Sequence, residues 1–308
     1  MDELKNENYR SGFITVLGRP NVGKSTLVNA LLGQKIAAVS PKPQTTRARQ
    51  LAILTDEDAQ IILMDTPGMH NPIHKLGRAM NAIVEETLQD SDIILWLVDA
   101  SQPPQGEDIL IANFLRAARN LPPVVMGLNK IDLLSKEELD AQRIVFGKMY
   151  SAAAEVIPIS ARRNSGLDDL LAKLKSMLPV GSSYYPAEQV TDYQERQIAA
   201  DLIREAALIF LQQEVPHAIA VRVDEYSERE SGAAYVAATI FVERDSQKGI
   251  VIGSGGKMLK KIGSVARKSI EEMSGRSIFL QLRVKVSENW RDNAVFLRRM
   301  GYETVEKK

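Results

Sequence analysis

This chain carries the run Gly18-Arg19-Pro20-Asn21-Val22-Gly23-Lys24-Ser25, and this run decides its fold. It follows the apolar segment Phe13-Ile14-Thr15-Val16-Leu17 and precedes the helix-like segment Thr26-Leu27-Val28-Asn29-Ala30-Leu31-Leu32. A strand, a glycine-containing loop and a helix in this order form a cradle for phosphate groups. The backbone N–H groups converge on phosphate oxygens, Lys24 reaches the β and γ phosphates, and the Ser25 hydroxyl is a ligand for Mg²⁺. The run, together with Thr26, therefore predicts a site for a nucleoside triphosphate.

The composition is that of a folded protein with room for two domains. The chain has 308 residues, of which 44% are hydrophobic and 25% charged. It contains no cysteine, which excludes disulfides and cysteine-ligated metals. The start, Met1-Asp2-Glu3-Leu4-Lys5, is too charged for a signal peptide, and the longest apolar run, 93–98, is far below the roughly 20 residues that span a bilayer. We therefore expect a cytoplasmic protein.

Charge is distributed unevenly along the chain. The formal net charge is zero, yet the span 244–285 holds ten Lys or Arg and three acidic residues. This span has a net charge of +7, so the rest of the chain has −7. Such a division predicts a lobe that binds a polyanion, joined to a lobe with a different task.

The order of apolar and amphipathic segments predicts an α/β domain followed by a smaller α+β domain. From residue 11 to about 180, strand-length apolar runs alternate with helix-length stretches, as in a mostly parallel sheet flanked by helices. The turn-forming stretch 179–186 interrupts this pattern. We assign residues 1–10 to an N-terminal tail, 11–180 to the nucleotide-binding domain, 181–190 to a linker, and 191–308 to a second domain with a C-terminal extension.

A second motif, Asp65-Thr66-Pro67-Gly68, ends the apolar run Ile61-Ile62-Leu63-Met64. Its position places a carboxylate at the carboxyl end of a strand beside the phosphate loop. Asp65 can hold Mg²⁺ through a water molecule, and the Gly68 N–H can face the γ phosphate. The backbone of this motif would then depend on whether the γ phosphate is present.

Two further motifs select the base. Asn129-Lys130-Ile131-Asp132 follows an apolar run, and the Asp132 carboxylate can accept two hydrogen bonds from guanine that adenine cannot donate. Asn129 would brace the loops, and Lys130 would lie along the base. Ser160-Ala161-Arg162 follows another strand and fits a contact from the Ala161 N–H to the guanine O6. The predicted ligand is therefore GTP or GDP.

The segment Ser40-Pro41-Lys42-Pro43-Gln44-Thr45-Thr46-Arg47 is polar and interrupted by proline. It lies between the first helix and the second strand, and we expect a switch loop there. A threonine in this loop can complete the Mg²⁺ shell. Either Thr45 or Thr46 could do so, and we favour Thr46.

The basic lobe contains a glycine loop, Gly253-Ser254-Gly255-Gly256, between a strand and a helix. A G-x-x-G loop lets the backbone approach the sugar-phosphate chain of RNA, while a neighbouring apolar groove receives single-stranded bases. The cations Lys257, Lys260 and Lys261 follow directly. The order helix, strand, strand, helix, helix, strand is that of a type II KH domain, so we expect RNA binding at these residues.

The motifs G-R-P-N-V-G-K-S-T-L-V-N, P-Q-T-T-R and D-T-P-G resemble those of the Era family of GTPases. The resemblance extends to Asn289-Trp290-Arg291-Asp292 and 297–302, and so covers nearly the whole chain. It implies hydrolysis of GTP to GDP and phosphate, with Lys24, Thr46, Gly68 and Asn21 taking part. It also implies a partner, the 3′ end of small-subunit ribosomal RNA, and a role in maturing the small subunit.

Two residues bear on catalysis. Met69 stands after D-T-P-G, where Ras-like proteins keep a water-positioning glutamine, so we expect slow unassisted turnover. In proteins related to this one, the residue at Asn21 helps to bind a monovalent cation that takes the place of an arginine finger. The resemblance therefore implies stimulation by K⁺.

The sequence thus predicts a monomeric GTP-controlled switch that acts on ribosomal RNA, either free in the cytoplasm or peripheral to the inner face of the cell membrane. One alternative is a GTP-controlled adaptor whose basic lobe docks on an acidic protein or a membrane surface. Another is a GTPase whose turnover is itself the function. Both leave the glycine loop and the uneven charge without a use.

Overall fold

The computed structural model describes residues 8–40, 42, 45–229 and 232–302. Most of the predicted tail, three residues of the predicted switch loop (Pro41, Pro43 and Gln44) and residues 303–308 lie outside the described residues. By its internal contacts the described chain divides into two compact units. Unit 1 takes in 8–34, 47–71 and 80–192, and unit 2 takes in the remainder.

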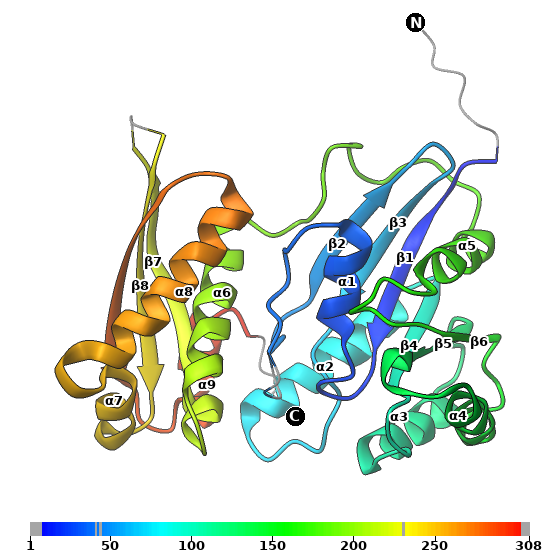
Figure 1. The fold of residues 1–308 in the computed structure, drawn as a ribbon, viewed down its shortest axis with the longest axis horizontal. Helices are drawn as coiled ribbons and strands as arrows, with labels where there is room; N and C mark the ends of the chain where they lie inside the picture. Colours follow the sequence, from blue (N-terminus) through cyan, green and yellow to red (C-terminus); the bar gives the residue numbers. More distant parts are fainter. Residues whose placement is uncertain (1–7, 41, 43–44, 230–231, 303–308) are drawn as a thin grey trace, which may run out of the picture. The chain divides into compact units, whose positions relative to one another are not determined.

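Unit 1 is built on a six-stranded sheet in the order β2-β3-β1-β4-β5-β6, flanked by helices (Figure 1). Strand β2 runs antiparallel to β3, and all other neighbours are parallel. The strands are β1 (Arg10–Leu17), β2 (Gln50–Thr55), β3 (Ala59–Asp65), β4 (Ile93–Asp99), β5 (Val124–Asn129) and β6 (Glu155–Pro158). The helices are α1 (Lys24–Leu32), α2 (Lys75–Gln89), α3 (Gly106–Ala117), α4 (Lys136–Met149) and α5 (Leu167–Met177), with the short 3-10 turn η1 (Ile131–Leu133). The predicted fold class of this unit is confirmed.

The strands β3 and β4 of unit 1 are buried along their whole length and are mostly apolar. Every residue of β3 and β4 is buried, which explains why the predicted strands read as continuous hydrophobic runs rather than alternating ones. Because β1, β3, β4, β5 and β6 are parallel, their carboxyl ends lie at one edge of the sheet. The four predicted nucleotide motifs all begin at this edge, where ligands bind in open α/β sheets.

The predicted linker packs on unit 1 rather than standing apart from it. The Ile53 N–H donates to the Val190 carbonyl at 2.9 Å, and the Leu51 N–H donates to the Asp192 carboxylate at 2.9 Å. The Gln60 side-chain oxygen accepts from the amides of Tyr184 and Tyr185. These contacts supply partners for the outer backbone donors of β2, and the last segment of unit 1 continues to residue 192.

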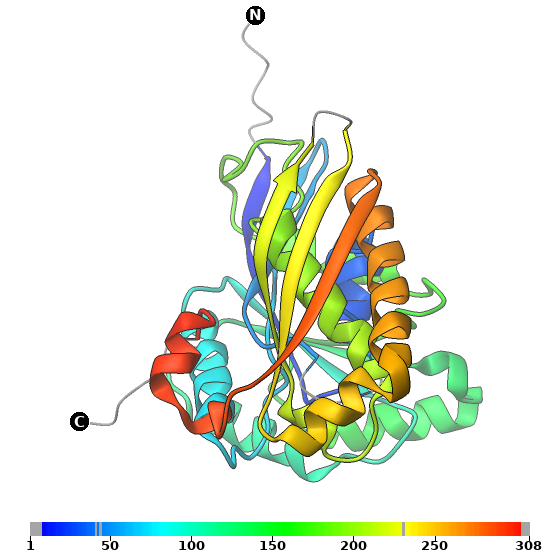
Figure 2. The same ribbon diagram turned by 90° about the vertical axis from the view of Figure 1, so that its left-hand side faces the viewer.

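Unit 2 contains a three-stranded sheet in the order β7-β8-β9, with its two longest helices, α6 and α8, on one face (Figure 2). Strand β7 is antiparallel to β8, and β8 is parallel to β9. The chain order α6, β7, β8, α7, α8, β9 is the predicted type II KH order. The elements are α6 (Glu195–Phe210), η2 (Val215–Ala218), β7 (Ala220–Glu228), β8 (Ala234–Val242), α7 (Asp245–Ile252), η3 (Ser254–Gly256), α8 (Lys257–Ser274), β9 (Ile278–Val286), η4 (Trp290–Asp292) and α9 (Ala294–Arg299).

The start of β7 differs from the expected one. The alternation of residues predicts a strand from His217, but His217 lies in η2 and the strand begins at Ala220. Pro216 lies in the first turn of η2, where its fixed φ suits a helical turn, and the His217 N–H donates to the Glu214 carbonyl at 3.2 Å and not to a strand. Trp290 is fully buried in this unit, and its Nε1 donates to the Ala218 carbonyl at 2.8 Å, so it serves as core packing.

The longest hydrophobic run and the longest helix both belong to the folded units. The run from Ile93 forms β4, in the middle of the unit 1 sheet. Helix α8 has 18 residues, but its buried side chains are confined to one stripe, Ile262, Ala266 and Ile270. Over the ranges that the structure describes, no helix combines the length and apolar character needed to cross a bilayer.

Candidate nucleotide and nucleic-acid sites

The phosphate loop connects β1 to α1 in a conformation that its residue types favour. Asn21 has φ 64° and Gly23 has φ 104°, both in the left-handed region that asparagine and glycine tolerate best. A Cβ at position 23 would lie 2.4 Å from the Asn129 side-chain nitrogen. Glycine at this position is therefore favoured both by the backbone conformation and by the close approach of Asn129.

Lys24 is held inside the phosphate loop. Its side chain is nearly buried, and its Nζ donates to the carbonyls of Gly18 at 3.0 Å and Arg19 at 3.1 Å. Burial lowers the pKa of Lys24 to about 8, opposed by the Asp65 carboxylate, while Arg19 adds to the lowering. The loop thus keeps an ammonium group where phosphate oxygens would need one.

Ser25 and Asp65 meet at the base of the loop, as predicted for two magnesium ligands. The Ser25 hydroxyl donates to the Asp65 carboxylate at 2.8 Å, and Asp65 is fully buried. A hydroxyl and a carboxylate oxygen are the hard donors that suit Mg²⁺, so these residues fit the ion. Thr46 belongs to unit 2, and its role as a further ligand stays a prediction.

The motif 65–68 is fixed against the phosphate loop. The Thr66 hydroxyl donates to the Val16 carbonyl at 2.8 Å, and the Met69 N–H donates to the Gly18 carbonyl at 3.3 Å. A Cβ at Gly68 would lie 2.6 Å from the Pro20 backbone nitrogen. The motif 65–68 and the phosphate loop pack so closely that a change of structure in one must displace the other.

Met69 packs in the core of unit 1 and is 2% exposed, so its side chain takes no part in orienting a water molecule. The neighbouring His70 ring contacts the Gly68 carbonyl at 2.9 Å through Nδ1. In the part of the chain that the structure describes, no group of three His, Asp or Glu side chains could hold a metal ion.

Asn129 joins three of the four motifs. Its Nδ2 donates to the Val22 carbonyl at 2.8 Å, and its Oδ1 accepts from the Ala161 N–H at 2.9 Å. The Ser160 hydroxyl donates to Asp132 at 2.6 Å, which orients the carboxylate expected to read guanine. The predicted brace is therefore present. Because the Ala161 N–H already donates to Asn129, its contact with the guanine O6 stays a prediction, as does any role of the exposed Arg162.

The sequence analysis did not identify two acidic residues, Asp99 and Asp108, that contact Arg19 of the phosphate loop. Asp99 accepts from Lys130 Nζ at 2.6 Å and lies 3.6 Å from the Arg19 guanidinium, whose Nε donates to Asp108 at 3.0 Å. The Arg19 side chain thus pairs with Asp99 and Asp108. A bound nucleotide would therefore contact Arg19 through its backbone. Asp99 could have been found, because it ends the apolar run of β4 as Asp65 ends that of β3.

The pKa values of Asp99 and Asp108 are shifted in opposite directions. Burial acts to raise the pKa of Asp99, but hydrogen bonds from Lys130 and Ser101 outweigh it and leave that pKa below its ordinary value. Burial also raises the pKa of Asp108, and there the hydrogen bonds from Gln105 and Arg19 only partly offset the increase. Asp99 is therefore kept in its charged form, in which it pairs with Lys130 and Arg19.

The glycine loop of unit 2 turns sharply between two helices, α7 and α8, and not between a strand and a helix as expected. Gly253 has φ 72°, and a Cβ there would lie 2.7 Å from the Cβ of Met258. The turn is closed by a hydrogen bond from the Gly256 N–H to the Gly253 carbonyl at 3.1 Å. This loop presents backbone groups at the start of α8, next to exposed Lys257 and Lys260.

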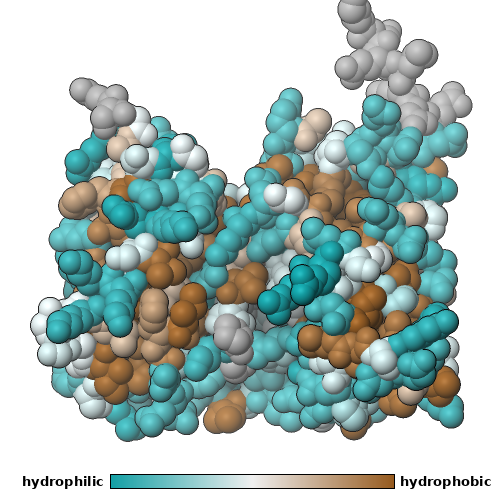
Figure 3. All heavy atoms as spheres, in the orientation of Figure 1, coloured by the Kyte–Doolittle hydropathy of each residue, from teal (hydrophilic) through white to brown (hydrophobic). Residues whose placement is uncertain are grey.

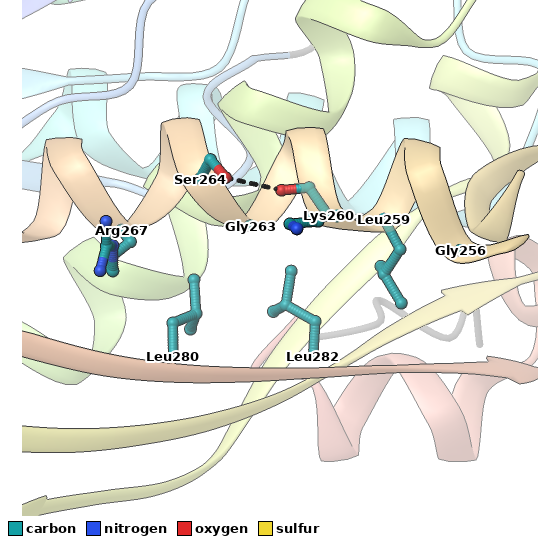
Figure 4. A pocket seen from close by; sticks show the side chains of 8 residues that line it. All are labelled: Gly256, Leu259, Lys260, Gly263, Ser264, Arg267, Leu280 and Leu282. Atoms are coloured by element: carbon teal, nitrogen blue, oxygen red, sulfur yellow. Dashed lines mark hydrogen bonds between the residues drawn. The ribbon is translucent and has the colours of Figure 1, made fainter.

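A groove of about 390 Å³ begins at this loop and runs between α8 and β9 (Figure 4). Lys260 and Arg267 stand on its helix side, and leucine side chains from β9 point toward the helix. Apolar side chains gather over α7 and α8 in Figure 3, with hydrophilic ones around them. The lining residues are Gly256, Leu259, Lys260, Gly263, Ser264, Arg267, Leu280 and Leu282.

Only some of the residues predicted to bind RNA line the groove. Gly256 and Lys260 line it, whereas Lys257 and Lys261 are exposed and are not among the lining residues. Arg267 and the two leucines were missed. Arg267 could have been found from the helical spacing 256, 260, 263, 267, which places these residues on one face of α8.

Comparisons with known proteins bear on both units. Residues 13–130 match a family described as 50S ribosome-binding GTPase, and residues 214–291 match the KH domain family. The chain is 45% identical over 297 residues to GTPase Era of Ruminiclostridium cellulolyticum, covering 96% of this chain and 99% of that protein. It is 46% identical to GTPase Era of Heliobacterium modesticaldum, with 96% and 98% covered.

Solved structures agree with the sequence matches. One is Era in complex with MgGDPNP and nucleotides 1506–1542 of 16S ribosomal RNA, with a TM-score of 0.91, 35% identity and coverage of 96% of this chain and 99% of that one. Another is a Tyr-to-Ala variant of Aquifex aeolicus Era bound to GDP·AlF4⁻, with a TM-score of 0.90, 35% identity and coverage of 95% and 99%.

Proposed function

Because the chain belongs to the Era family of GTPases, we propose that it is a GTP-hydrolysing switch that binds the 3′ end of small-subunit ribosomal RNA and assists assembly of that subunit. The observation that carries the RNA part is the groove beside the glycine loop, where leucines from two elements lie between two cations. Such a site accepts unstacked bases and their phosphates. The ribosomal partner implies a location in the cytoplasm; contact with the membrane has no support in the structure.

The proposed chemistry is in-line attack of water on the γ phosphorus of GTP. Backbone N–H groups of 18–26 and the Lys24 ammonium would bind the phosphates. Mg²⁺ held at Ser25 and Asp65, with Thr46 as a third ligand, would neutralise charge on the phosphate oxygens. No general base is assigned, and buried Met69 cannot position the water, so turnover should be slow until a partner assists. Asn21 is the proposed K⁺ ligand, and equal turnover in KCl and NaCl would refute that role.

The switch requires that RNA binds the GTP and GDP states with different affinities. By linkage, RNA must then change the affinity for the nucleotide by the same factor. Calorimetry with a non-hydrolysable GTP analogue and with GDP tests this directly. Identical RNA affinity in the two states would refute the switch and leave RNA binding itself untouched.

The RNA site is tested by comparing Lys260→Ala with Lys261→Ala, which remove the same charge from neighbouring positions. The probe is a 15-nucleotide RNA from the 3′ end of bacterial small-subunit ribosomal RNA, and affinity is measured across salt concentrations. Lys260 lines the groove, so its loss should weaken binding more and reduce the salt slope by about 0.7. Unchanged affinity and slope in both variants would contradict RNA binding at this groove.

A further inference from the structure

The sheet of unit 2 has a second face, opposite the helices, that the proposed function does not use (Figure 2). Leu280 and Leu282 of β9 line the groove against α8. Successive side chains of a strand alternate between the two faces, so Phe279, Gln281, Arg283 and Lys285 point to the opposite one. Their partners on β8 in the register are Tyr235, Ala237, Thr239 and Phe241.

One end of this face carries an exposed aromatic pair. The rings of Tyr235 and Phe279 are stacked, with centroids 5.8 Å apart and planes at 21°, and Phe279 is 60% exposed. The Arg229 guanidinium lies 5.3 Å from the Tyr235 ring and 5.7 Å from the Phe279 ring. The three side chains form a positively charged aromatic cluster in which the Phe279 ring stays largely exposed.

Cations continue from this pair along β9. Arg283 and Lys285 are both exposed. Arg283 lies four residues after Phe279, about 13 Å along the strand, and Lys285 lies two residues further, about 7 Å. Two acids share the face: Asp224, which is bonded to Arg222 and Thr239, and Glu225. Among the described residues, four Arg or Lys side chains stand against these two acids, so the face is net positive.

At the other end of this face the aromatic side chain of Phe241 is buried. Phe241 is 7% exposed, packed edge-on by Phe296 of α9 at 5.1 Å and capped by Arg222 at 5.2 Å. The Phe279 ring also has an arginine over it, Arg229 at 5.7 Å, yet it remains 60% exposed. An apolar ring left open beside exposed cations favours a ligand that has both flat rings and negative charge.

We propose that this face is a second RNA-binding surface, on which Phe279 stacks a base while Arg283 and Lys285 bind the adjoining phosphates. Aromatic side chains on a sheet with flanking cations are the means by which several protein folds hold single-stranded nucleic acid. Strand β9 lies at the edge of its sheet, with the groove on one face and Phe279 on the other. One RNA strand that passes over this edge can contact both. The proposal rests on the proposed function, since it assumes that the chain binds RNA.

The test compares Phe279→Ala and Arg283→Gln with Val295→Ala, which truncates another exposed apolar side chain of unit 2 (58% exposed). With the 15-nucleotide RNA in fluorescence anisotropy, Phe279→Ala should bind about tenfold more weakly, and Val295→Ala should bind as the unaltered protein does. Urea unfolding checks that all variants keep their stability. If Phe279→Ala and Arg283→Gln bind normally while Lys260→Ala binds weakly, the second surface is refuted and the groove stands. If all of them bind normally, both proposals fail.

Stacking itself is tested by fluorescence. Trp96 and Trp290 are fully buried, so Phe279→Trp introduces the exposed indole of the protein. RNA stacked on this position should quench its emission, with a midpoint that matches the anisotropy titration. Ile109→Trp, at a position 51% exposed in unit 1, should keep its emission. Equal responses from the two variants would overturn stacking at position 279.

Discussion

Lys130 donates a hydrogen bond to the Asp99 carboxylate at 2.6 Å. Arg19 of the phosphate loop lies 3.6 Å from the same oxygen, so one buried acid links the loop that binds phosphate to the loop expected to read the base. Truncating one partner of such a network leaves charged groups without their counter-ion.

We expect Asp99→Asn to weaken GDP binding by about tenfold, because both loops lose the charge that positions them. Stopped-flow fluorescence with a labelled GDP measures the effect, which should fall mainly on the dissociation rate. Asp140→Asn, which removes an exposed acid from α4, is the matched control. Equal affinity in both variants would mean that Asp99 does not position the loops.

Lys24 should make the stability of the nucleotide-free protein depend on pH. Its pKa is about 8 in the folded chain and 10.5 ordinarily, so between these values the unfolded state binds the extra proton. Below pH 8 the cost of burying the charge is present in full. Stability should therefore rise with pH from 8 to 10.5, by about 1.4 kcal/mol per pH unit from this group.

Urea unfolding with EDTA, at pH 7.5 and 9.5, measures this effect. Other groups titrate in the same range, so the comparison is with Lys24→Met, which lacks the titrating ammonium. The difference between the two proteins should change in the stated direction. A constant difference would show that burial does not perturb Lys24.

Gly68→Ala should disturb the phosphate loop. The added Cβ would lie 2.6 Å from the Pro20 nitrogen and 2.8 Å from its Cα, both backbone atoms that cannot swing away. We expect a loss of about 1–3 kcal/mol of stability and at least about tenfold weaker nucleotide binding. Thermal unfolding and GDP titration measure the two effects.

Gly147→Ala is the control for Gly68→Ala, because position 147 lies inside α4 with open space around its Cβ. Alanine there should stabilise the protein by about 0.5–1 kcal/mol. Identical behaviour of the two variants would contradict the close packing of 65–68 on the phosphate loop.

Asp132→Asn should shift the preference from GTP toward xanthosine triphosphate. Ser160 holds the Asp132 carboxylate at 2.6 Å, and an amide in that place can no longer accept two hydrogen bonds from guanine. We expect the affinity ratio to change by about a hundredfold or more. Competition binding with the two nucleotides measures it, and retained guanine selectivity would remove Asp132 from base recognition.

The sequence predicts most of the unit 1 fold because its central strands are buried on both faces. Runs such as 93–98 are therefore continuous and easy to find, and the motif loops follow at their ends. The Lys130–Asp99 pair was missed because it joins residues 31 positions apart, and only the pairing of β4 with β5 brings them together.

In unit 2 the limits are different. The periodicity of α8 and β9 is plain in the sequence, but which residues of β9 face the helix depends on how the sheet packs. Leu280 and Leu282 could not be assigned to the groove for that reason. The start of β7 was misplaced because alternation from His217 does not reveal the 3-10 turn that begins beside Pro216 and continues to Ala218.

The packing of residues 184–192 along β2 determines where the chain can be divided. A fragment that stops at residue 180, the boundary predicted from the sequence, would lack Val190 and Asp192. The amides of Ile53 and Leu51 would then have lost the acceptors of their hydrogen bonds. A bare row of strand donors invites pairing between copies, so this fragment should self-associate in solution. A fragment that ends at Asp192 retains its own cover and should stay dispersed.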